Sequence, residues 1–400
     1  MLGRHKLNAQ AKLSIAVLVL IGLAIVGYAL FGSSGKSGHN YTSELVYADY
    51  NEGNISLADK TGKQTSKSNL PEFNLLNYQA IAPNGGVLVN LNGGMDNESF
   101  IFTHNNTQKT FTGDSAKLLS SAVLVQDSHQ MFFKDENTVL FTACADSSAS
   151  CSLHSFNVSN STNSKLLDTG VKQASQHTPS VYLVGYAPTQ HLAYVRVVNS
   201  ANKFGSSTNA IYEIDINNSK VTRNFNMPPS ASSTATLSPD GNKLAYITYD
   251  TKGNSTVNVL DLSNASVQKV SWNKGPLSTD PGALKWSPDS SKILTQNINI
   301  VKPSDVAAND KTQAPVVIAY IDLTSNNAIH TIQQINDPSQ EAIGSLGWLD
   351  NSQIVYQMKK STKVNGLAGT TNQTVKQKVS GGAATTLQTP SGDLTQVALY

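Results

Sequence analysis

The stretch Ser238-Pro239-Asp240-Gly241, followed by the apolar run Leu244-Ala245-Tyr246-Ile247, decides the fold of this chain. Proline presets φ for the first central position of a turn, and the aspartate side chain can bond nearby backbone. Glycine takes the left-handed conformation that lets the two flanking strands pair as a hairpin. The stretch therefore predicts a tight turn that leads into a β-strand.

The same signal recurs along the chain, each time just ahead of an apolar strand. The further copies are Ala82-Pro83-Asn84-Gly85, Ala187-Pro188-Thr189, Ser287-Pro288-Asp289 and the degenerate Lys134-Asp135-Glu136-Asn137 and Leu349-Asp350-Asn351-Ser352. They lie roughly 50 residues apart, the spacing of a repeat unit that cannot bury its own apolar face and has to stack on its neighbours. The chain is therefore expected to be an array of such units.

The clearest unit, residues 234–272, contains four strand signals. Strands are expected at residues 235–237, 243–249, 257–262 and 266–272, and residues 183–225 and 284–332 repeat the order. Four antiparallel strands make one blade of a β-propeller. Trp286 and Trp348 fall next to the turn in first strands, where their rings are expected to pack between adjacent blades.

The repeat resembles that of the TolB-like (PD40, WD40-like) β-propeller family. The matching elements are Trp286-Ser287-Pro288-Asp289, Leu237-Ser238-Pro239-Asp240-Gly241 and third strands that end as in Leu260-Asp261-Leu262. The resemblance covers most of the body and is strongest over residues 183–348. It implies an all-β propeller that works through protein contacts in the cell envelope. The α/β domain that precedes the propeller in that family is not expected in this sequence, so the resemblance does not predict TolB's own partners for it.

The two ends of the repeat region complete each other. Six units are complete, whereas residues 45–48 and 54–59 look like second and third strands without a first. Residues 394–399 fit the missing first strand. Joining them closes the ring and hides the edges of an open array. We favour seven blades closed by the N- and C-terminal strands; six or eight are the alternatives.

A membrane anchor is predicted ahead of the propeller. Residues 13–31 are apolar and uncharged, long enough at about 1.5 Å per residue to span about 30 Å of hydrocarbon. Arg4, Lys6 and Lys12 precede this segment, so residues 1–12 are expected in the cytoplasm. Residues 32–42 form a Gly/Ser tether, and residues 43–400 form a propeller outside, in the periplasm or at the cell surface. The alternative is a cleaved secretory signal, which exports the same body.

Cys144 and Cys151 are the only two cysteines, and both flanks of the loop between them look like strands. A hairpin brings the two sulfurs together, and outside the cytoplasm a disulfide is favoured over a metal site, which needs more ligands. The eight histidines are dispersed. No metal, cofactor or catalytic motif is predicted, and the formal net charge of +2 gives no support for nucleic acid as a partner.

Candidate binding residues lie on the propeller face that carries the loops between second and third strands and the connections between blades. Long polar loops are expected at residues 199–207, 301–314 and 359–371. Acidic residues expected near the channel mouth are Glu72, Asp280, Asp337, Glu341 and Asp393. The sequence predicts a single-pass membrane protein whose propeller functions by binding or scaffolding an envelope or cell-surface protein. The alternative is an enzyme acting on a glycan or another envelope polymer, for which these acids would have to converge.

Overall fold

The chain divides into two compact units, residues 1–41 and 42–400, and the residues described in the computed structural model all belong to the second. They are residues 43–49, 52–70, 76–92, 98–104, 107–120, 131–144, 150–172, 181–198, 202–204, 209–251, 255–271, 284–296, 316–335, 341–364, 367–390 and 393–399. In these ranges no helix is both long and apolar enough to cross a membrane. Residues 1–42, which carry the predicted anchor and tether, lie outside them.

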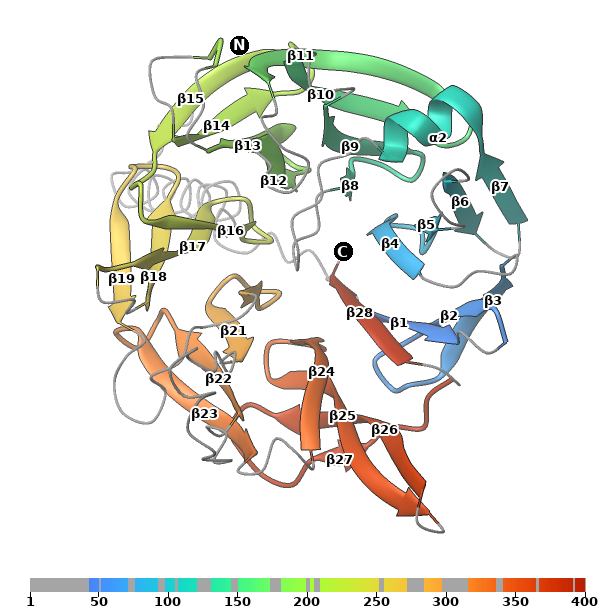
Figure 1. Ribbon diagram of the computed structural model, residues 1–400. Helices are drawn as coiled ribbons and strands as arrows, with labels where there is room; N and C mark the ends of the chain where they lie inside the picture. Colours follow the sequence, from blue (N-terminus) through green and yellow to red (C-terminus); the bar gives the residue numbers. More distant parts are fainter. Residues whose placement is uncertain are drawn as a thin grey trace, which may run out of the picture. The chain divides into compact units, whose positions relative to one another are not determined.

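The described residues form seven four-stranded antiparallel sheets arranged as the blades of a ring, as Figure 1 shows. We number the blades along the chain and list each from its inner to its outer strand. Blade 1 is β4 (Leu76–Ile81), β5 (Val87–Asn92), β6 (Glu98–His104) and β7 (Thr107–Phe111); blade 2 is β8 (Met131–Phe133), β9 (Thr138–Ala143), β10 (Ser150–Asn157) and β11 (Thr162–Lys172).

The next two blades are those whose strands the sequence predicts best. Blade 3 is β12 (Val181–Ala187), β13 (Leu192–Val197), β14 (Ala210–Asp215) and β15 (Lys220–Asn226); blade 4 is β16 (Ala231–Leu237), β17 (Lys243–Tyr249), β18 (Ser255–Asp261) and β19 (Val267–Ser271). All four strands expected in residues 234–272 are present, with ends shifted by a few residues.

The last three blades include the one made from both ends of the propeller. Blade 5 is β20 (Lys285–Trp286), β21 (Lys292–Gln296), β22 (Val316–Asp322) and β23 (Ala328–Ile335); blade 6 is β24 (Glu341–Trp348), β25 (Gln353–Val364), β26 (Leu367–Lys378) and β27 (Thr385–Thr386); blade 7 is β28 (Asp393–Leu399), β1 (Ser43–Asp49), β2 (Asn54–Ala58) and β3 (Gln64–Asn69).

Blade 7 confirms the predicted closure of the ring. Strand β28 pairs antiparallel with β1, with Val397 opposite Leu45 and Gln396 opposite Val46. Seven blades are present, so the six- and eight-blade alternatives are wrong. The closing strand removes the two open edges that a linear array would expose.

The turn motif forms the hydrogen bonds that its residue types predict. In blade 4 the Ser238 hydroxyl donates to Asp240 Oδ1 at 2.6 Å and accepts from the Lys243 N–H at 2.9 Å. Gly241 has a φ of 71°, the left-handed conformation expected for it. Blade 5 repeats the pattern with Ser287 and Asp289. The turn is therefore held by hydrogen bonds among its own residues and does not need a neighbouring blade to form them.

Apolar side chains fill the seams between adjacent blades. Each of the seven seams holds one cluster of buried residues, with members from both blades. Trp286 and Trp348 pack in such seams as predicted, and each indole N–H donates to the first strand of the preceding blade, to the Thr236 carbonyl at 3.2 Å and the Lys285 carbonyl at 2.9 Å. Blades therefore stack on one another, and none has a core of its own.

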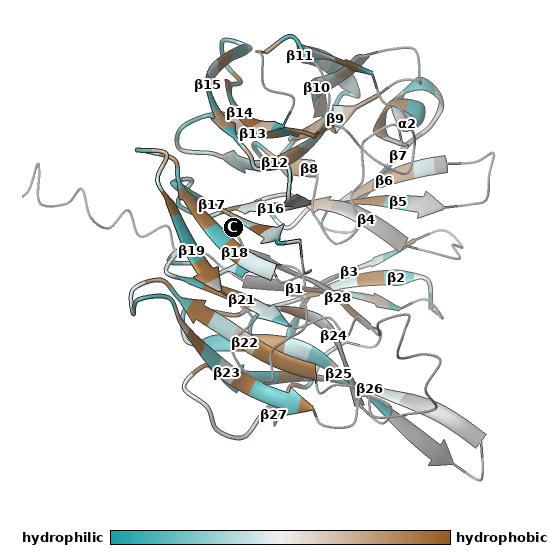
Figure 2. Ribbon diagram, turned by 60° about the vertical axis from the view of Figure 1, so that its left-hand side comes forward, coloured by the Kyte–Doolittle hydropathy of each residue, from teal (hydrophilic) through white to brown (hydrophobic). Residues whose placement is uncertain are grey.

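Outer strands are more hydrophilic than the third strands that they cover. Figure 2 shows the third strand β22 as largely hydrophobic and the outer strand β15 as largely hydrophilic, in agreement with their burial. A short helix α2 (Gly113–Ser120), which the sequence analysis did not predict, connects blades 1 and 2 and buries Ala116 and Leu119 in their seam.

Candidate functional site

The antiparallel order gives the propeller two unlike faces. Turns between first and second strands, and between third and fourth strands, lie on one side, which we call the turn face. The loops between second and third strands and the connections between blades lie on the other side, the loop face. The predicted binding loops and acidic residues belong to the loop face.

The acidic residues predicted at the channel mouth are only partly within the described residues. Glu72, Asp280 and Asp337 lie outside them. Glu341 begins β24, with its backbone opposite Lys360, and Asp393 begins β28, opposite Ala48. Both positions are at the loop-face ends of neighbouring inner strands. The backbone thus brings two of the five acids to the same edge of the channel, and convergence of the carboxylates stays a prediction.

Of the loop predicted at residues 199–207, the structure describes residues 202–204, which contact the neighbouring blade. The Lys203 N–H donates to the Thr169 carbonyl of β11 at 2.8 Å, and its ammonium lies 2.7 Å from Asp168 Oδ2. The Phe204 ring contacts Tyr212 edge-on, with the ring centroids 4.9 Å apart. Residues 202–204 therefore strap blade 3 to blade 2.

The carboxylate of Asp168 is the main polar partner of residues 202–204. Besides Lys203, it accepts hydrogen bonds from the Ser150 hydroxyl at 2.5 Å and the Gly170 N–H at 2.9 Å. The hydrogen bond from Lys203 is the largest cause that holds the pKa of Asp168 well below its usual range, followed by that from Ser150. The carboxylate is therefore charged throughout the physiological pH range.

The structure corrects the prediction of a long loop at residues 359–371. Most of these residues extend β25 and β26, which pair from Gln353↔Lys378 up to Val364↔Leu367. Strand β27 pairs only with Val375 and Lys376 of β26. The two long strands therefore project from the loop-face side of blade 6 as a hairpin, visible in Figure 1. The third predicted loop, residues 301–314, lies outside the described residues.

Cys144 and Cys151 form the predicted disulfide on the loop face of blade 2. They flank the loop between β9 and β10, which pair as predicted, with Ser152 opposite Ala143. In the described part of the chain no group of three or more His, Cys, Asp or Glu side chains is placed to hold a metal ion.

The seam between blades 3 and 4 contains polar residues that the sequence analysis did not single out. Arg196 of β13 is fully buried, and its Nη2 donates to Asn209 Oδ1 at 3.1 Å and to the Ala231 carbonyl at 3.5 Å. In the same seam, Tyr194 donates its hydroxyl to Glu213 Oε2 at 3.2 Å. The available signal was a charged residue inside an otherwise apolar strand, Leu192-Ala193-Tyr194-Val195-Arg196-Val197.

Glu213 has its own cationic partner. Arg223 donates Nε to Glu213 Oε1 at 2.9 Å, forms a second bond from Nη2 to Oε2, and uses Nη1 to reach the Leu262 carbonyl of blade 4 at 2.5 Å. Burial raises the pKa of Glu213, but the hydrogen bonds from Arg223 and Thr222 outweigh it and leave the pKa below its ordinary value. Glu213 is therefore a charged, paired carboxylate.

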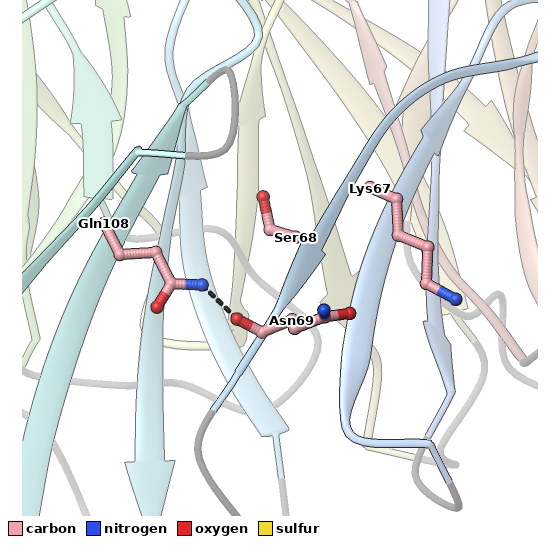
Figure 3. Close-up of a pocket in the computed structure, with 4 residues that line it drawn as sticks. All are labelled: Lys67, Ser68, Asn69 and Gln108. Atoms are coloured by element: carbon pink, nitrogen blue, oxygen red, sulfur yellow. Dashed lines mark hydrogen bonds between the residues drawn. The ribbon is translucent and has the colours of Figure 1, made fainter.

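A groove of about 540 Å³ lies at the outer rim between blades 7 and 1, shown in Figure 3. Lys67, Ser68 and Asn69 of β3 and Gln108 of β7 line it. Gln108 Nε2 donates to the Asn69 carbonyl, Ser68 accepts from Thr103 at 2.6 Å, and Lys67 pairs with Glu52 at 3.0 Å. These contacts join blade 7 to blade 1 and occupy the polar groups named, so the groove is not assigned as a ligand site.

Neither a protein-family model nor a curated protein matches the sequence. Solved structures that resemble the chain include TolB from Acinetobacter baumannii, 14% identical with a TM-score of 0.43 over 78% of this chain and 68% of that one. Hydrazine synthase from Kuenenia stuttgartiensis is 15% identical with a TM-score of 0.46, over 70% and 75% of the two chains. The Cps50 (Swd1) β-propeller domain from Myceliophteria thermophila is 10% identical with a TM-score of 0.45, over 80% and 93%. The assignment of a seven-bladed propeller rests on the sheet topology of this chain itself, and a fold of this kind does not specify an activity.

Proposed function

We propose that this protein is a membrane-tethered propeller, exposed outside the cytoplasm, that binds a protein of the cell envelope or cell surface through its loop face. One observation carries the proposal: insertions on the loop face are held in defined positions by the ring. Residues 202–204 are strapped onto β11, and β25 and β26 extend blade 6 as a paired hairpin. Preorganised elements on a rigid scaffold bind with a smaller loss of conformational entropy.

The location outside the cytoplasm is supported by the sequence and by the disulfide. Residues 13–31 are apolar, with Arg4, Lys6 and Lys12 ahead of them. Cys144 and Cys151 are paired, which is common in exported proteins and rare in the cytosol. The proposal therefore keeps the N-terminus inside and the propeller outside.

Site-specific photocrosslinking in intact cells tests the binding face. A photoreactive residue is placed at Asn372 and at Ser230 on the loop-face side, and at the matched turn-face positions Lys60 and Asn218; all four are exposed. We expect one discrete protein adduct from the loop-face positions and none from the turn-face controls. Adducts from the turn face alone, or from neither face, would contradict the proposal, and recovered polysaccharide at the loop face would favour the glycan enzyme.

Fractionation tests the tether separately. The full chain is expected in the membrane pellet after alkaline extraction. A variant in which residues 13–31 are replaced by a cleavable secretory segment is expected to be exported but released. If the full chain is itself recovered as a soluble exported protein, the anchor hypothesis is wrong and the alternative of a cleaved signal holds.

A further inference from the structure

Several blades carry a polar residue at one place on the second strand, near the loop face. It lies three residues after the position that pairs with the inner-strand residue just ahead of the turn motif, for example Ala193 opposite Tyr186 in blade 3. In each case the residue faces the seam with the following blade. These residues, which we call the seam belt, are Asn90, Thr142, Arg196, Gln296 and Gln357.

Arg196 differs from the other members in charge. Asn90 Oδ1, Thr142 Oγ1 and Gln296 Oε1 are buried atoms without a hydrogen-bond partner in the described protein, and all three are neutral. Arg196 likewise has no partner for Nε and Nη1 among the described residues. A neutral atom needs only a hydrogen bond, whereas a buried guanidinium also needs a compensating negative charge.

The geometry leaves most of the Arg196 guanidinium available although the side chain is 0% exposed. Its two bonds, to Asn209 and to the Ala231 carbonyl, both use Nη2. Nε and Nη1 together carry three N–H donors. Asn209 is itself fixed, because its Nδ2 donates to the Pro228 carbonyl at 2.9 Å.

Among the described residues, the charges of this seam do not balance. Glu213 is paired with Arg223, so it does not neutralise a second cation. Burial lowers the pKa of Arg196, and the described groups that act against this are the hydroxyls of Tyr182 and Tyr246, with no carboxylate among them. Burial raises the pKa of Tyr182 to about 12, so this hydroxyl is neutral at physiological pH. Arginine does not deprotonate in proteins, so one positive charge remains.

We infer that the seam between blades 3 and 4 binds a small monovalent anion, such as chloride or formate, against Nε and Nη1 of Arg196. The anion supplies the missing charge and accepts from the donors that the protein leaves unused. The occupant is small because Tyr182, Tyr194 and Tyr246 are buried in the same seam. The site goes beyond the proposed partner binding and does not depend on it, because the ion would join blade 3 to blade 4.

Thermal unfolding of the full chain in a neutral detergent tests the inference. Chloride, formate or the bulky anion gluconate is titrated as its sodium salt at constant ionic strength. We expect the unfolding midpoint to rise with chloride and formate relative to gluconate, by about 2 °C for each tenfold increase above the dissociation constant. Arg196→Met is expected to abolish this difference. The matched variant Gln296→Leu, at the equivalent place in blade 5, is expected to retain it.

Equal midpoints of the wild-type protein in all three salts would overturn the inference. So would a chloride effect that persists in Arg196→Met or disappears in Gln296→Leu. Because Arg196→Met could fail to fold, crystals of the unmodified protein grown in bromide give a second readout. An anomalous peak within hydrogen-bonding distance of Arg196 Nε or Nη1 is expected, and its absence would exclude the site.

Discussion

The turn face and the seam belt are built from the same repeat, but they connect neighbouring blades in different ways. On the turn face the Asp240 N–H donates to Ser290 Oγ of the next blade at 3.1 Å, and the Asp289 N–H donates to Asn351 Oδ1 at 2.9 Å. In the seam belt, atoms such as Thr142 Oγ1 have no partner in the described protein. These two turn-face bonds link blades 4, 5 and 6, whereas the seam belt, which lies nearer the loop face where binding is expected, retains buried polar atoms without such bonds.

The largest effect expected from breaking the turn-face connections is at Trp348. This side chain is 1% exposed and donates to the Lys285 carbonyl of blade 5. Trp348→Ala removes a buried ring from the seam between blades 5 and 6, and we expect it to lower the free energy of unfolding by about 3–5 kcal/mol. Trp348→Phe keeps an aromatic ring but loses the donor, and a loss of about 1–2 kcal/mol is expected. Chemical denaturation monitored by circular dichroism measures both.

Trp286 provides the matched control because it makes the same bond one seam earlier, to the Thr236 carbonyl. Trp286→Phe should cost as much as Trp348→Phe within about 0.5 kcal/mol, and the double variant should be additive, since the two indoles lie in different seams. A negligible cost for both phenylalanine variants would show that the indole bonds do not hold the blades together.

The fold could be predicted because the same turn motif and the same apolar strands recur from one blade to the next. Ser238-Pro239-Asp240-Gly241 dictates a turn by local chemistry, and the Ile321-Asp322-Leu323 pattern marks the end of a third strand. Even the closing strand could be assigned, because residues 394–399 fill a slot that is otherwise missing. Prediction worked where short-range chemistry and burial agree.

The features that were missed depend on contacts between blades or lie outside the core. The hairpin in residues 353–378 carries the turn signal Asn365-Gly366, but its outer part is rich in Lys, Thr and Gly and lacks the apolar alternation of a half-buried strand. Arg196 stands out as a charged residue in an apolar strand, but the strand alone does not say whether the next blade covers it. No local pattern states which charged residue a neighbouring blade will bury.

A smaller effect is expected on the loop face, at Asp168. Asp168→Asn retains an acceptor for Ser150 and Gly170 and removes the charge that faces Lys203. Because both partners of this ion pair are partly exposed, the expected loss at pH 7 is about 0.5–1 kcal/mol. Lys203→Met should cost a similar amount, and the double variant should cost little more than either alone.

The pH dependence gives the sign of this contribution. The hydrogen bond from Lys203 lowers the pKa of Asp168 in the folded protein, whereas the pKa of an aspartate carboxyl in the unfolded chain is about 4. The charge on Asp168 therefore stabilises the folded protein fully above about pH 4, and this stabilisation is lost as the pH falls toward the pKa of Asp168 in the folded protein. Denaturation midpoints of the wild-type and Asp168→Asn proteins should converge below pH of about 4. If the difference between the two midpoints stays constant down to pH 2, the loss of stability in Asp168→Asn is not due to the charge.

The smallest effect, and the sharpest test of the contrast between the two regions, is expected at Thr142. Its hydroxyl is buried with no partner in the described protein, and valine has nearly the same shape. Thr142→Val should leave the free energy of unfolding unchanged or raise it by up to about 1 kcal/mol, because no protein hydrogen bond is lost and a desolvated oxygen is removed. Ser238→Ala is the turn-face counterpart, since Ser238 both donates and accepts, and we expect it to cost about 1–2 kcal/mol. If Thr142→Val costs as much as Ser238→Ala, the hydroxyl is fully satisfied in solution, and the seam belt is a bonded network like the turn face.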